Sequence, residues 1–517
     1  MANALPFFNI NKELCIDNGG KNHLLIEGDN VDALKAMQYT HKGTVDVIYI
    51  DPPYNAGADV GYVDTGWSRT DWIKMLTPSI ALGHALLKDS GVIMVSIDDS
   101  PLTPYLEILI QNVFGPTNKI STRPWTGKSG GSNGKHLYKE HEFVITYAKS
   151  IDDFVSNRQP VDQSEAADGE EVFVDDSGRR YVVGDDLHGW GGIDKSDATF
   201  PLVAPDGTEF YHERTDGTHF DWRVPRALKS KGMTKEQNMF KLIDDGEVHF
   251  YKNQKGKWKA SSKKWLNDDM TTLTPSILRQ GKASTTMLQN MVGFKAFGYP
   301  KPVALLEELV RWAGPKDSVV LDYFAGSGTT GHAVADLNHK DGGSRQFILV
   351  TNNENNIFDE ATYPRIKAAL TGDWANGKGS PREASLTVLN TNTFDIDVDS
   401  DHSIMESMSD KFVALAALKE DAYDVEEHTG YFVCRGVVDG LNRTVLVWVD
   451  IYDDFGLEDA LNSVQPDVAY LACESLSIFG NSLDKFGTQF YPMPVDFAKT
   501  VINSNKLINT ITDKFAI

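Results

Sequence analysis

Short apolar runs alternate with amphipathic segments over the first 150 residues. Four runs rich in β-branched residues predict strands at 24–26, 45–50, 91–97 and 143–147. After the first of these, Asp29 precedes apolar residues at helical spacing, which predicts a helix with an aspartate cap. Strands that alternate with helices are typical of a mostly parallel sheet.

The same alternation returns over residues 291–394. Pro302 stands at a favoured first-turn position of a helix whose apolar residues recur every three or four positions. A strand at 319–322, a glycine-rich turn, a helix from about Thr329 and a strand at 347–350 are predicted to follow. This second α/β stretch belongs with the first in one fold class, an α/β protein with a mostly parallel sheet.

Two further stretches differ in character. Residues 151–290 are rich in turns, aromatic residues and charges, and their periodicity is weak. Residues 395–517 open with alternating aspartates that suggest a linker, and a small α/β pattern follows. Its predicted elements are strands at 431–438, 444–449 and 468–471 and a helix near 458–464. We therefore predict four parts, at 1–150, 151–290, 291–394 and 395–517.

Composition bounds the class of protein. The chain has 517 residues, of which 41% are hydrophobic and 24% charged, so a disordered, collagenous or coiled-coil chain is excluded. It has three cysteines, no apolar run of the ~18 residues that a membrane helix needs, and no basic region before an apolar stretch at its start. We expect a soluble, cytoplasmic protein with no membrane partner.

The net charge of −23 argues at first against a nucleic-acid partner. The charges are segregated, however. Residues 151–221 hold 5 basic and 18 acidic residues, and residues 395–517 hold 8 and 22, so these two stretches carry −13 and −14 and the rest carries +4. Residues 222–265 alone hold 12 basic and 4 acidic residues. A DNA-binding stretch is therefore compatible with the total, and acidic flanks would repel non-specific phosphate.

The first candidate for chemistry is Asp51-Pro52-Pro53-Tyr54, at the end of a predicted strand. Ligands of open α/β sheets bind beyond the carboxyl ends of strands. A carboxylate and a carbonyl can accept the two N–H bonds of a planar amine while the tyrosine ring stacks on its base. A strand-ending turn with a buried tyrosine is the alternative for this tetrapeptide.

The second candidate is the glycine-rich turn that follows Asp322. Gly326, Gly328 and Gly331 fit a GxGxxG pattern, but no lysine follows as in a P-loop. Asp322 would repel a pyrophosphate and attract an ammonium, and S-adenosylmethionine carries an ammonium. A tight β–α turn with a capping aspartate is the alternative.

Together, Asp-Pro-Pro-Tyr and Asp-x-Phe-x-Gly-x-Gly resemble the motifs of DNA amino-methyltransferases of the N6-adenine type. The catalytic motif precedes the cofactor turn, as in the β group of that family, with a target-recognition region between the halves. Further segments are similar to modification (Mod) subunits of type III restriction–modification systems. These segments are Leu25–Asn30, Ser96–Asp99, Glu140–Val144, Pro205–Gly207, Trp222–Arg223, Gly246–Phe250, Pro300–Pro302 and Arg345–Val350.

The resemblance implies a Rossmann-like, S-adenosylmethionine-dependent methyltransferase fold with circularly permuted motif order. It implies that Asp51 and the Pro52 carbonyl accept hydrogen bonds from the amino group of a flipped adenine, on which Tyr54 stacks. Pro53 completes the catalytic motif. The residues that it implies for the cofactor are Asp29, Lys301, Asp322, Phe324, Gly326, Gly328, Thr329 and Glu354. Among these, Lys301 would lie near the methionine carboxylate and Glu354 near the ribose. Methyl transfer needs no metal, and we predict none.

DNA contacts are expected from two basic stretches, 119–149 and 222–265, the second of which also carries Trp258 and Trp265. A solvated charged face is the alternative for the second stretch. The candidate DNA-binding residues are Lys128, Lys135, Lys139, Arg223, Lys229, Lys231, Lys257 and Lys263.

The sequence therefore predicts site-specific N6-adenine methylation of duplex DNA by a type III modification subunit. N4-cytosine methylation is an alternative, although relatives with that activity more often begin the tetrapeptide with serine. A second alternative is a subunit that chiefly recognises DNA for a partner. With no Walker A lysine motif, a restriction subunit with helicase or nuclease activity would be a separate polypeptide. An NAD-dependent oxidoreductase leaves Asp51–Tyr54 and Asp322 unexplained. We expect residues 395–517 to serve homodimerisation or partner docking.

Overall fold

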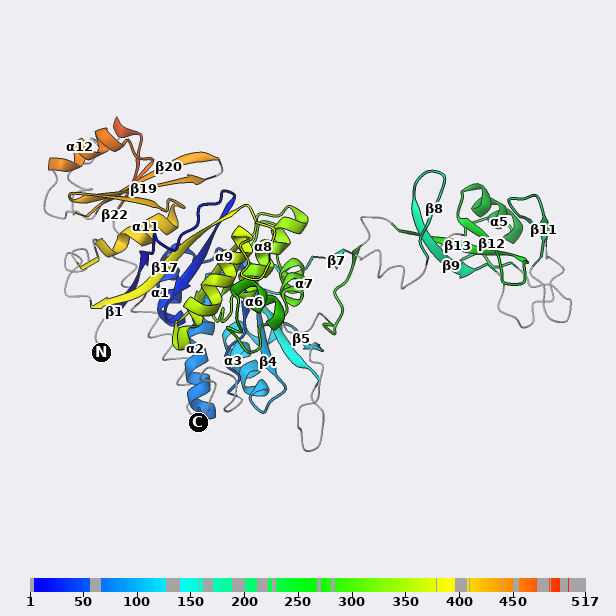
Figure 1. The fold of residues 1–517 in the computed structure, drawn as a ribbon, viewed down its shortest axis with the longest axis horizontal. Helices are drawn as coiled ribbons and strands as arrows, with labels where there is room; N and C mark the ends of the chain where they lie inside the picture. The colour runs from blue at the N-terminus through cyan, green and yellow to red at the C-terminus, as the bar shows by residue number, and fades with distance from the viewer. Residues whose placement is uncertain are drawn as a thin grey trace. The chain divides into compact units, whose positions relative to one another are not determined.

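The structure is a computed structural model, and it describes most of the chain. The described residues are 4–55, 67–126, 140–157, 159–160, 171–187, 200–211, 222–225, 229–266, 271–279, 284–377, 379–395, 407–408, 410–438, 440–449, 455–471, 483, 485–492 and 501. Contacts divide the chain into two compact units, which Figure 1 draws in one view without fixing their relative placement. One unit comprises Met1–Asn157 with Pro275–Ile517, and the other is Arg158–Thr274.

A nine-stranded sheet forms the centre of the first unit. Its strands, in spatial order, are β1 (Ala4–Ile10), β17 (Ala384–Asp395), β2 (Lys21–Glu27), β16 (Gln346–Thr351), β15 (Val319–Asp322), β3 (Val45–Ile50), β4 (Leu87–Asp98), β6 (Glu142–Ala148) and β5 (Lys119–Trp125). The six strands from β17 to β4 are parallel, whereas β1 and β6 pair antiparallel at either side. The strands predicted near 24, 45, 91, 143, 319 and 347 are all present.

Helices cover both faces of this sheet, because successive residues of the central strands point to opposite faces. On one face, Ile48 and Ile50 pack with α1 (Asn30–Thr40), α2 (Arg69–Leu86) and α3 (Thr103–Phe114). On the other, Val47 and Tyr49 pack with α7 (Val303–Ala313), α8 (Thr329–Asp341) and α9 (Tyr363–Thr371). α6 (Thr285–Val292) packs on α9. The predicted α/β fold with a mostly parallel sheet is confirmed, as is the aspartate cap of α1, because Asp29 accepts from the Val31 and Asp32 amides.

The C-terminal stretch builds a second sheet within the same unit. Its order is β18 (Asp424–His428), β19 (Tyr431–Val438), β20 (Leu441–Trp448), β21 (Val468–Leu471) and β22 (Gln489–Pro492). α11 (Val413–Lys419) lies between this sheet and α1, and its side chains join one core with both. α12 (Phe455–Val464) packs against the other face. The stretch is therefore joined to the large sheet through a shared core. Asp395, which we expected in a linker, instead ends β17 opposite Ala4.

The second unit is built around a four-stranded antiparallel sheet. Its order is β12 (Val248–Lys252), β13 (Trp258–Leu266), β9 (Arg180–Asp186) and β8 (Phe173–Val174). α5 (Lys235–Asp244) shares a small core with this sheet, centred on Trp222 and Met239. Two short strand pairs complete the unit, β10 (Leu202–Val203) with β11 (Glu209–Phe210) and β7 (Gln159–Pro160) with β14 (Thr271–Thr272). The unit begins later and ends earlier in the sequence than the predicted range 151–290.

Both chain segments that lead into the second unit are anchored on the first. The Asn157 amide donates to the Trp312 carbonyl at the end of α7 (2.8 Å), and its side chain donates to the Gly314 carbonyl (2.6 Å). On the return path, Leu278 exchanges backbone hydrogen bonds with Pro124 and Thr126 beside β5. These anchors fix both ends of the insertion independently of its interior.

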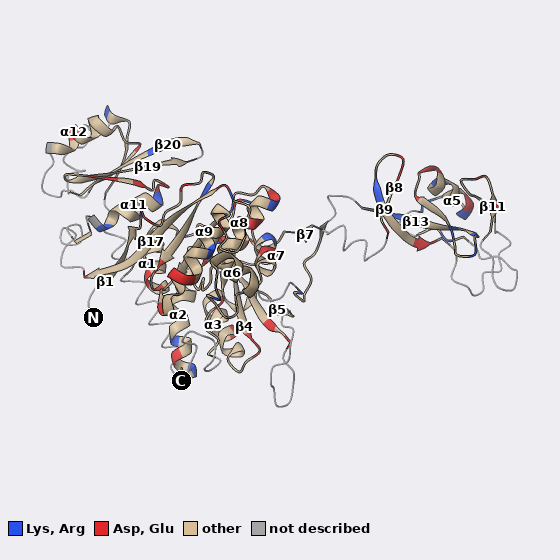
Figure 2. Cartoon of the chain, in the orientation of Figure 1, with Lys and Arg blue, Asp and Glu red and all other residues tan. Residues whose placement is uncertain are grey.

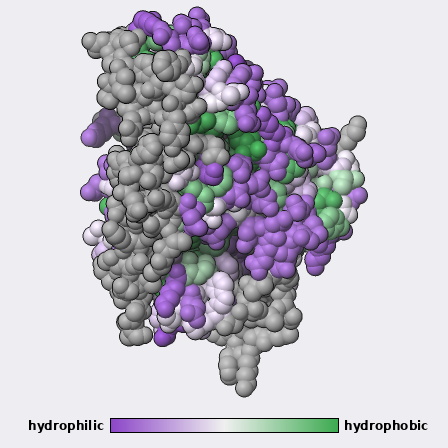
Figure 3. Space-filling view, turned by 90° about the vertical axis from the view of Figure 1, so that its left-hand side faces the viewer, coloured by the Kyte–Doolittle hydropathy of each residue, from purple (hydrophilic) through white to green (hydrophobic). Residues whose placement is uncertain are grey.

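The surface drawn in Figure 3 is mostly hydrophilic where residues are described, with hydrophobic positions in small separate patches. None of the described helices combines the length and the apolar character that crossing a membrane requires.

Candidate active site

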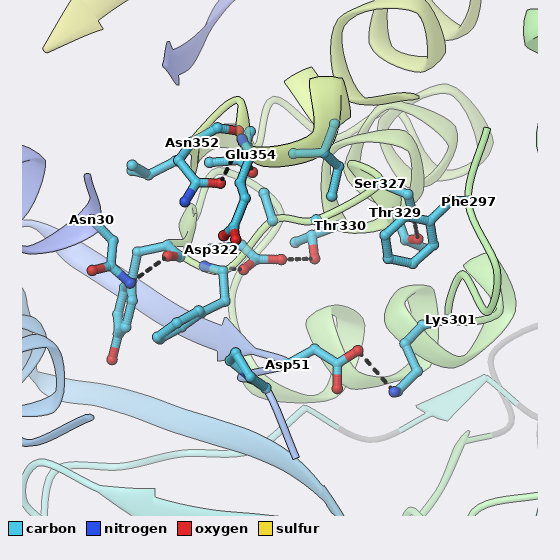
Figure 4. Close-up of a pocket in the computed structure, with 18 of the residues that line it drawn as sticks. Asn30, Asp51, Phe297, Lys301, Asp322, Ser327, Thr329, Thr330, Asn352 and Glu354 are labelled. Atoms are coloured by element: carbon cyan, nitrogen blue, oxygen red, sulfur yellow. Dashed lines mark hydrogen bonds and ion pairs between the residues drawn. The ribbon is translucent and has the colours of Figure 1, made fainter. Parts of the chain in front are cut away.

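Four strands of the large sheet deliver polar groups to one edge. β3 leads to Asp51, β15 ends in Asp322, β2 leads to Asp29, and β16 leads to Asn352. Since these strands are parallel, their carboxyl ends meet, and all four residues line one pocket of about 320 Å³ (Figure 4). The structure thus brings together the two motifs that stand 271 positions apart in the sequence (322 minus 51).

Asp322 is a buried carboxylate beneath the glycine-rich turn. Its side chain accepts hydrogen bonds from the Phe324 amide (3.0 Å) and from the Thr330 hydroxyl, and only 2% of the residue is exposed. Burial raises the pKa of Asp322 to about 7, and the nearby Asp51 carboxylate adds to that rise. Within the described part of the chain, no lysine, arginine or histidine pairs with it. An ammonium placed in the pocket would therefore gain a strong partner.

The turn itself keeps its backbone close to the pocket. Gly326 lines the pocket at φ +49°, and Gly328 immediately precedes α8 at φ +75°, conformations that disfavour other residues. Gly328 is not among the lining residues, because it lies behind the turn toward Thr362 and Ile366. Arg365 supports the turn from beneath through the Thr329 hydroxyl (2.7 Å).

The Asp51 carboxylate is already engaged. The Tyr54 hydroxyl donates to its Oδ1 (2.6 Å), and the Lys301 ammonium lies 2.8 Å from its Oδ2. The indole of Trp72 donates to the Pro53 carbonyl (2.7 Å), which fixes the turn that presents Asp51. Burial, the Asp51 charge and the Glu142 charge raise the pKa of Tyr54 well above its ordinary value, so this hydroxyl stays protonated.

Lys301 joins three oxygen atoms. Its Nζ lies 2.8 Å from Asp51 Oδ2, 2.8 Å from the Tyr54 hydroxyl and 3.3 Å from Glu142 Oε2. Burial alone would lower the pKa of Lys301, but the carboxylates of Asp51 and Glu142 raise it above its ordinary value. The structure therefore brings Lys301 to the catalytic motif. The methionine-carboxylate contact expected from the sequence would require it to leave these partners.

The remaining predicted cofactor residues divide by position. Asp29, Phe324, Thr329 and Glu354 line the pocket together with Asp322 and Gly326. Asp29 also caps α1, and Glu354 is exposed at the start of a short turn after β16. The predicted roles of these residues stay predictions.

Sequence reasoning missed several residues of this site. Asn30, Phe297, Tyr299, Thr330 and Asn352 line the pocket, and Glu142 reaches the catalytic motif from β6. The signal for Glu142 was its place directly before a predicted strand. In an antiparallel neighbour, the first residue of the strand lies at the edge where the parallel strands end.

The predicted DNA-binding residues lie partly outside the described residues, as Lys128, Lys135 and Lys139 do. Arg223, Lys229, Lys231 and Lys257 are exposed in the second unit. Lys263 differs, because its ammonium lies over the rings of Tyr181 (4.5 Å) and Trp265 (5.1 Å).

Basic and acidic positions both occur along the elements of the second unit (Figure 2), and some of these residues pair with one another. Lys252 contacts Asp206 (3.4 Å), which also accepts from the Trp258 indole, and the Trp265 indole donates to Glu247. Part of the basic stretch is thus neutralised within the unit, and both tryptophan indoles are engaged there.

Comparison with known proteins shows which family the chain belongs to. The family described as DNA methylase, N6_N4_Mtase, matches residues 45–362, which include both Asp51 and Asp322. The chain belongs to this DNA methylase family. It is 30% identical over 400 residues to the type III restriction-modification enzyme StyLTI Mod subunit of Salmonella typhimurium, which confirms the predicted resemblance to Mod subunits. The match covers 68% of this chain and 56% of that relative.

Two further proteins align with the methylase over most of their own lengths. The type II methyltransferase M.KpnI of Klebsiella pneumoniae is 30% identical over 63% of this chain and 79% of its own. The solved structure of the cytosine-N4-specific PvuII DNA methyltransferase aligns over 70% of this chain and 95% of its own, at 10% identity and a TM-score of 0.35. The chain spans little more than half the length of the type III Mod subunits that it matches.

Proposed function

We propose that this methylase transfers a methyl group from S-adenosylmethionine to the N6 amino group of a flipped adenine in duplex DNA. The observation that carries the proposal is the shared pocket, in which Asp51 and Asp322 stand at the ends of neighbouring strands. Asp322 suits an ammonium, and Asp51, which Lys301 already contacts, suits a neutral amine. Family membership supports the reaction class.

The residues of the pocket fit S-adenosylmethionine. Asp322 is buried without a cationic partner in the described part of the chain, so the ammonium of the methionine moiety would complete it. Phe324 and Phe297 offer apolar walls, and Glu354 and Asn352 offer acceptors at the exposed side. When bound, this cofactor supplies an electrophilic methyl group on a sulfonium.

The tetrapeptide side of the pocket fits the amino group. Asp51 would accept one amino hydrogen and the Pro52 carbonyl the other, which orients the nitrogen lone pair toward the methyl group. The ring of Tyr54, over which the Lys301 ammonium lies at 5.0 Å, would stack on a flipped base. A base must leave the duplex to reach such a pocket, and unstacking costs a few kcal/mol.

We further propose that the second unit reads the DNA sequence through Arg223, Lys229, Lys231 and Lys257, and that Lys128, Lys135 and Lys139 contact the DNA near the flipped base. The relatives support a modification subunit that pairs with a restriction subunit.

We also propose that the chain forms a homodimer through its C-terminal sheet. Light scattering tests it, with Val437→Lys in the exposed end of the β19–β20 hairpin as the variant. A monomeric mass for the wild type, or a dimeric mass that the variant leaves unchanged, would count against a dimer contact through this hairpin.

A tritium-transfer assay tests the central proposal. Labelled S-adenosylmethionine is incubated with mixed-sequence duplex DNA and with wild-type protein or Asp51→Ala. The DNA is then digested and the labelled nucleoside identified by mass spectrometry. Labelled N6-methyladenine that depends on Asp51 supports the proposal. Labelled N4-methylcytosine would reassign the base. No label despite binding of DNA and cofactor would leave a recognition subunit.

A further inference from the structure

Three charged groups and one hydroxyl meet behind the catalytic motif. Asp51, Glu142 and Lys301 contribute two carboxylates and one ammonium, and the Tyr54 hydroxyl lies within 3.3 Å of all three. The side chains of Glu142 and Lys301 are only 6% and 10% exposed. Their charges are therefore weakly screened by water and must be balanced locally.

The balance of this cluster depends on Glu142. With all three groups ionised, the formal charge is −1. Without Glu142, Lys301 would pair with Asp51 alone and the cluster would be neutral. Asp322, the buried carboxylate at the end of the neighbouring strand, would be balanced by the cofactor ammonium and does not change this count.

We propose that Glu142 is a positioning residue that holds Lys301 and offsets its charge, so that Lys301 does not cancel the negative charge that Asp51 presents to the target amino group. This inference rests on the proposed methyl transfer. In that reaction the amino nitrogen forms a bond to the methyl carbon as the carbon–sulfur bond breaks, with its electron pair going to sulfur. Positive charge thereby moves from sulfur to nitrogen, and a nitrogen-bound proton later leaves to Asp51 and then to water.

The cluster also explains how a base can approach an occupied carboxylate. In the described geometry, both oxygen atoms of Asp51 already have partners, Tyr54 and Lys301. An incoming amino group needs one of these oxygens. Lys301 can yield Asp51 Oδ2 without losing its charge partner, because Glu142 Oε2 is only 3.3 Å away. Glu142 is thus the group that receives the ammonium when the base arrives.

A double-mutant cycle tests the inference. Glu142→Gln leaves the cluster neutral and should lower the methyl-transfer rate at saturating substrates by about 10- to 100-fold. Glu142→Gln combined with Lys301→Met restores a single negative charge and should be faster than Glu142→Gln alone. In the Lys301→Met background, loss of Glu142 should cost little, since its role runs through Lys301. Glu140→Gln, an exposed change two positions earlier, is the matched control.

Two readouts other than turnover accompany the cycle. Binding of sinefungin, a non-reactive cofactor analogue, and fluorescence of DNA carrying 2-aminopurine at the target position should be unchanged in Glu142→Gln. A double variant no faster than Glu142→Gln would overturn the inference, as would a Glu142→Gln enzyme with the wild-type rate. Should Glu142→Gln alone fail to fold, the rates of Lys301→Met and of the double variant are compared. A much lower rate in the double variant would then overturn the inference. Absence of transfer by the wild type contradicts the proposed function instead.

Discussion

Asp51 and Asp322 end neighbouring parallel strands and line the same pocket, yet their electrostatic surroundings are opposite. Asp51 has an ammonium 2.8 Å from one oxygen, whereas the described partners of Asp322 are an amide and a hydroxyl. Asp51 therefore has a cationic partner before any ligand arrives, whereas Asp322 has none among the described residues. The difference indicates where each ligand group belongs: a cation beside Asp322 and a neutral amine beside Asp51.

The largest expected effect comes from removing the charge of Asp51, the carboxylate that Lys301 contacts. Asp51→Asn keeps the shape of the side chain but turns an acceptor into a donor facing Lys301, so methyl transfer should fall by about 10²- to 10³-fold. Single-turnover transfer measures this loss. Sinefungin affinity should stay within about twofold, and Asp317→Asn, an exposed aspartate before β15, should change neither quantity. Equal losses of rate and of sinefungin affinity would contradict the division of the pocket.

Removing the charge of Asp322, which has no cationic partner among the described residues, should affect binding instead. Asp322→Asn deletes a charge-assisted hydrogen bond and should weaken sinefungin binding by about 10- to 100-fold, measured by calorimetry. Methylthioadenosine, which lacks the amino-acid moiety, provides the matched comparison, and its affinity should barely change. A parallel loss for both ligands would point to a damaged fold rather than a lost ion pair.

The raised pKa of Asp322 makes the same contrast visible through pH. Its carboxyl has a pKa of about 7 in the ligand-free protein, and an ammonium ligand binds the ionised form. Below pH 7 the carboxyl must first lose its proton, so sinefungin affinity should fall by about tenfold for each pH unit. Above pH 8 the affinity should level off. In Asp322→Asn this slope should vanish, and a persistent slope would assign it to another group.

A smaller effect is expected in the second unit, where exposed and ring-bound cations can be compared. Arg223→Ala should weaken DNA binding a few-fold and lower the salt-dependence slope by about one, which titrations at several salt concentrations measure. Lys263 lies over the rings of Tyr181 and Trp265. Lys263→Ala should therefore lower the melting temperature and leave the salt-dependence slope of DNA binding nearly unchanged. An unchanged melting temperature with a slope lowered by about one would instead make Lys263 a phosphate ligand.

The sequence was informative where strands are buried on both faces. Runs such as 47–50 and 347–350 carry continuous apolar residues that are typical of a covered parallel sheet, and the candidate catalytic residues follow their ends. β1 and β17 were missed. β1 lies at the rim of the sheet, and the second half of β17, which pairs with it, carries polar residues such as Asn390, Asn392 and Thr393 that obscure the pattern.

The partners of Lys301 could not be predicted for a different reason. The motif locates its backbone near the pocket but gives no information on which acid its flexible side chain reaches across 250 positions. Glu142 was likewise hidden, because the direction of β6 decides which end of that strand meets the pocket. The second unit has short antiparallel strands and a small core, so its periodicity is weak.

The anchoring of Asn157 and Leu278 has an evolutionary consequence. Both ends of the inserted unit are held by backbone contacts to α7 and β5, and these contacts do not depend on what lies between them. A recombination event that replaces residues 158–274 as one cassette would leave Asp51, Glu142, Lys301 and Asp322 untouched. Under the function proposed above, such an exchange would change the recognised DNA sequence and leave the residues of the pocket in place.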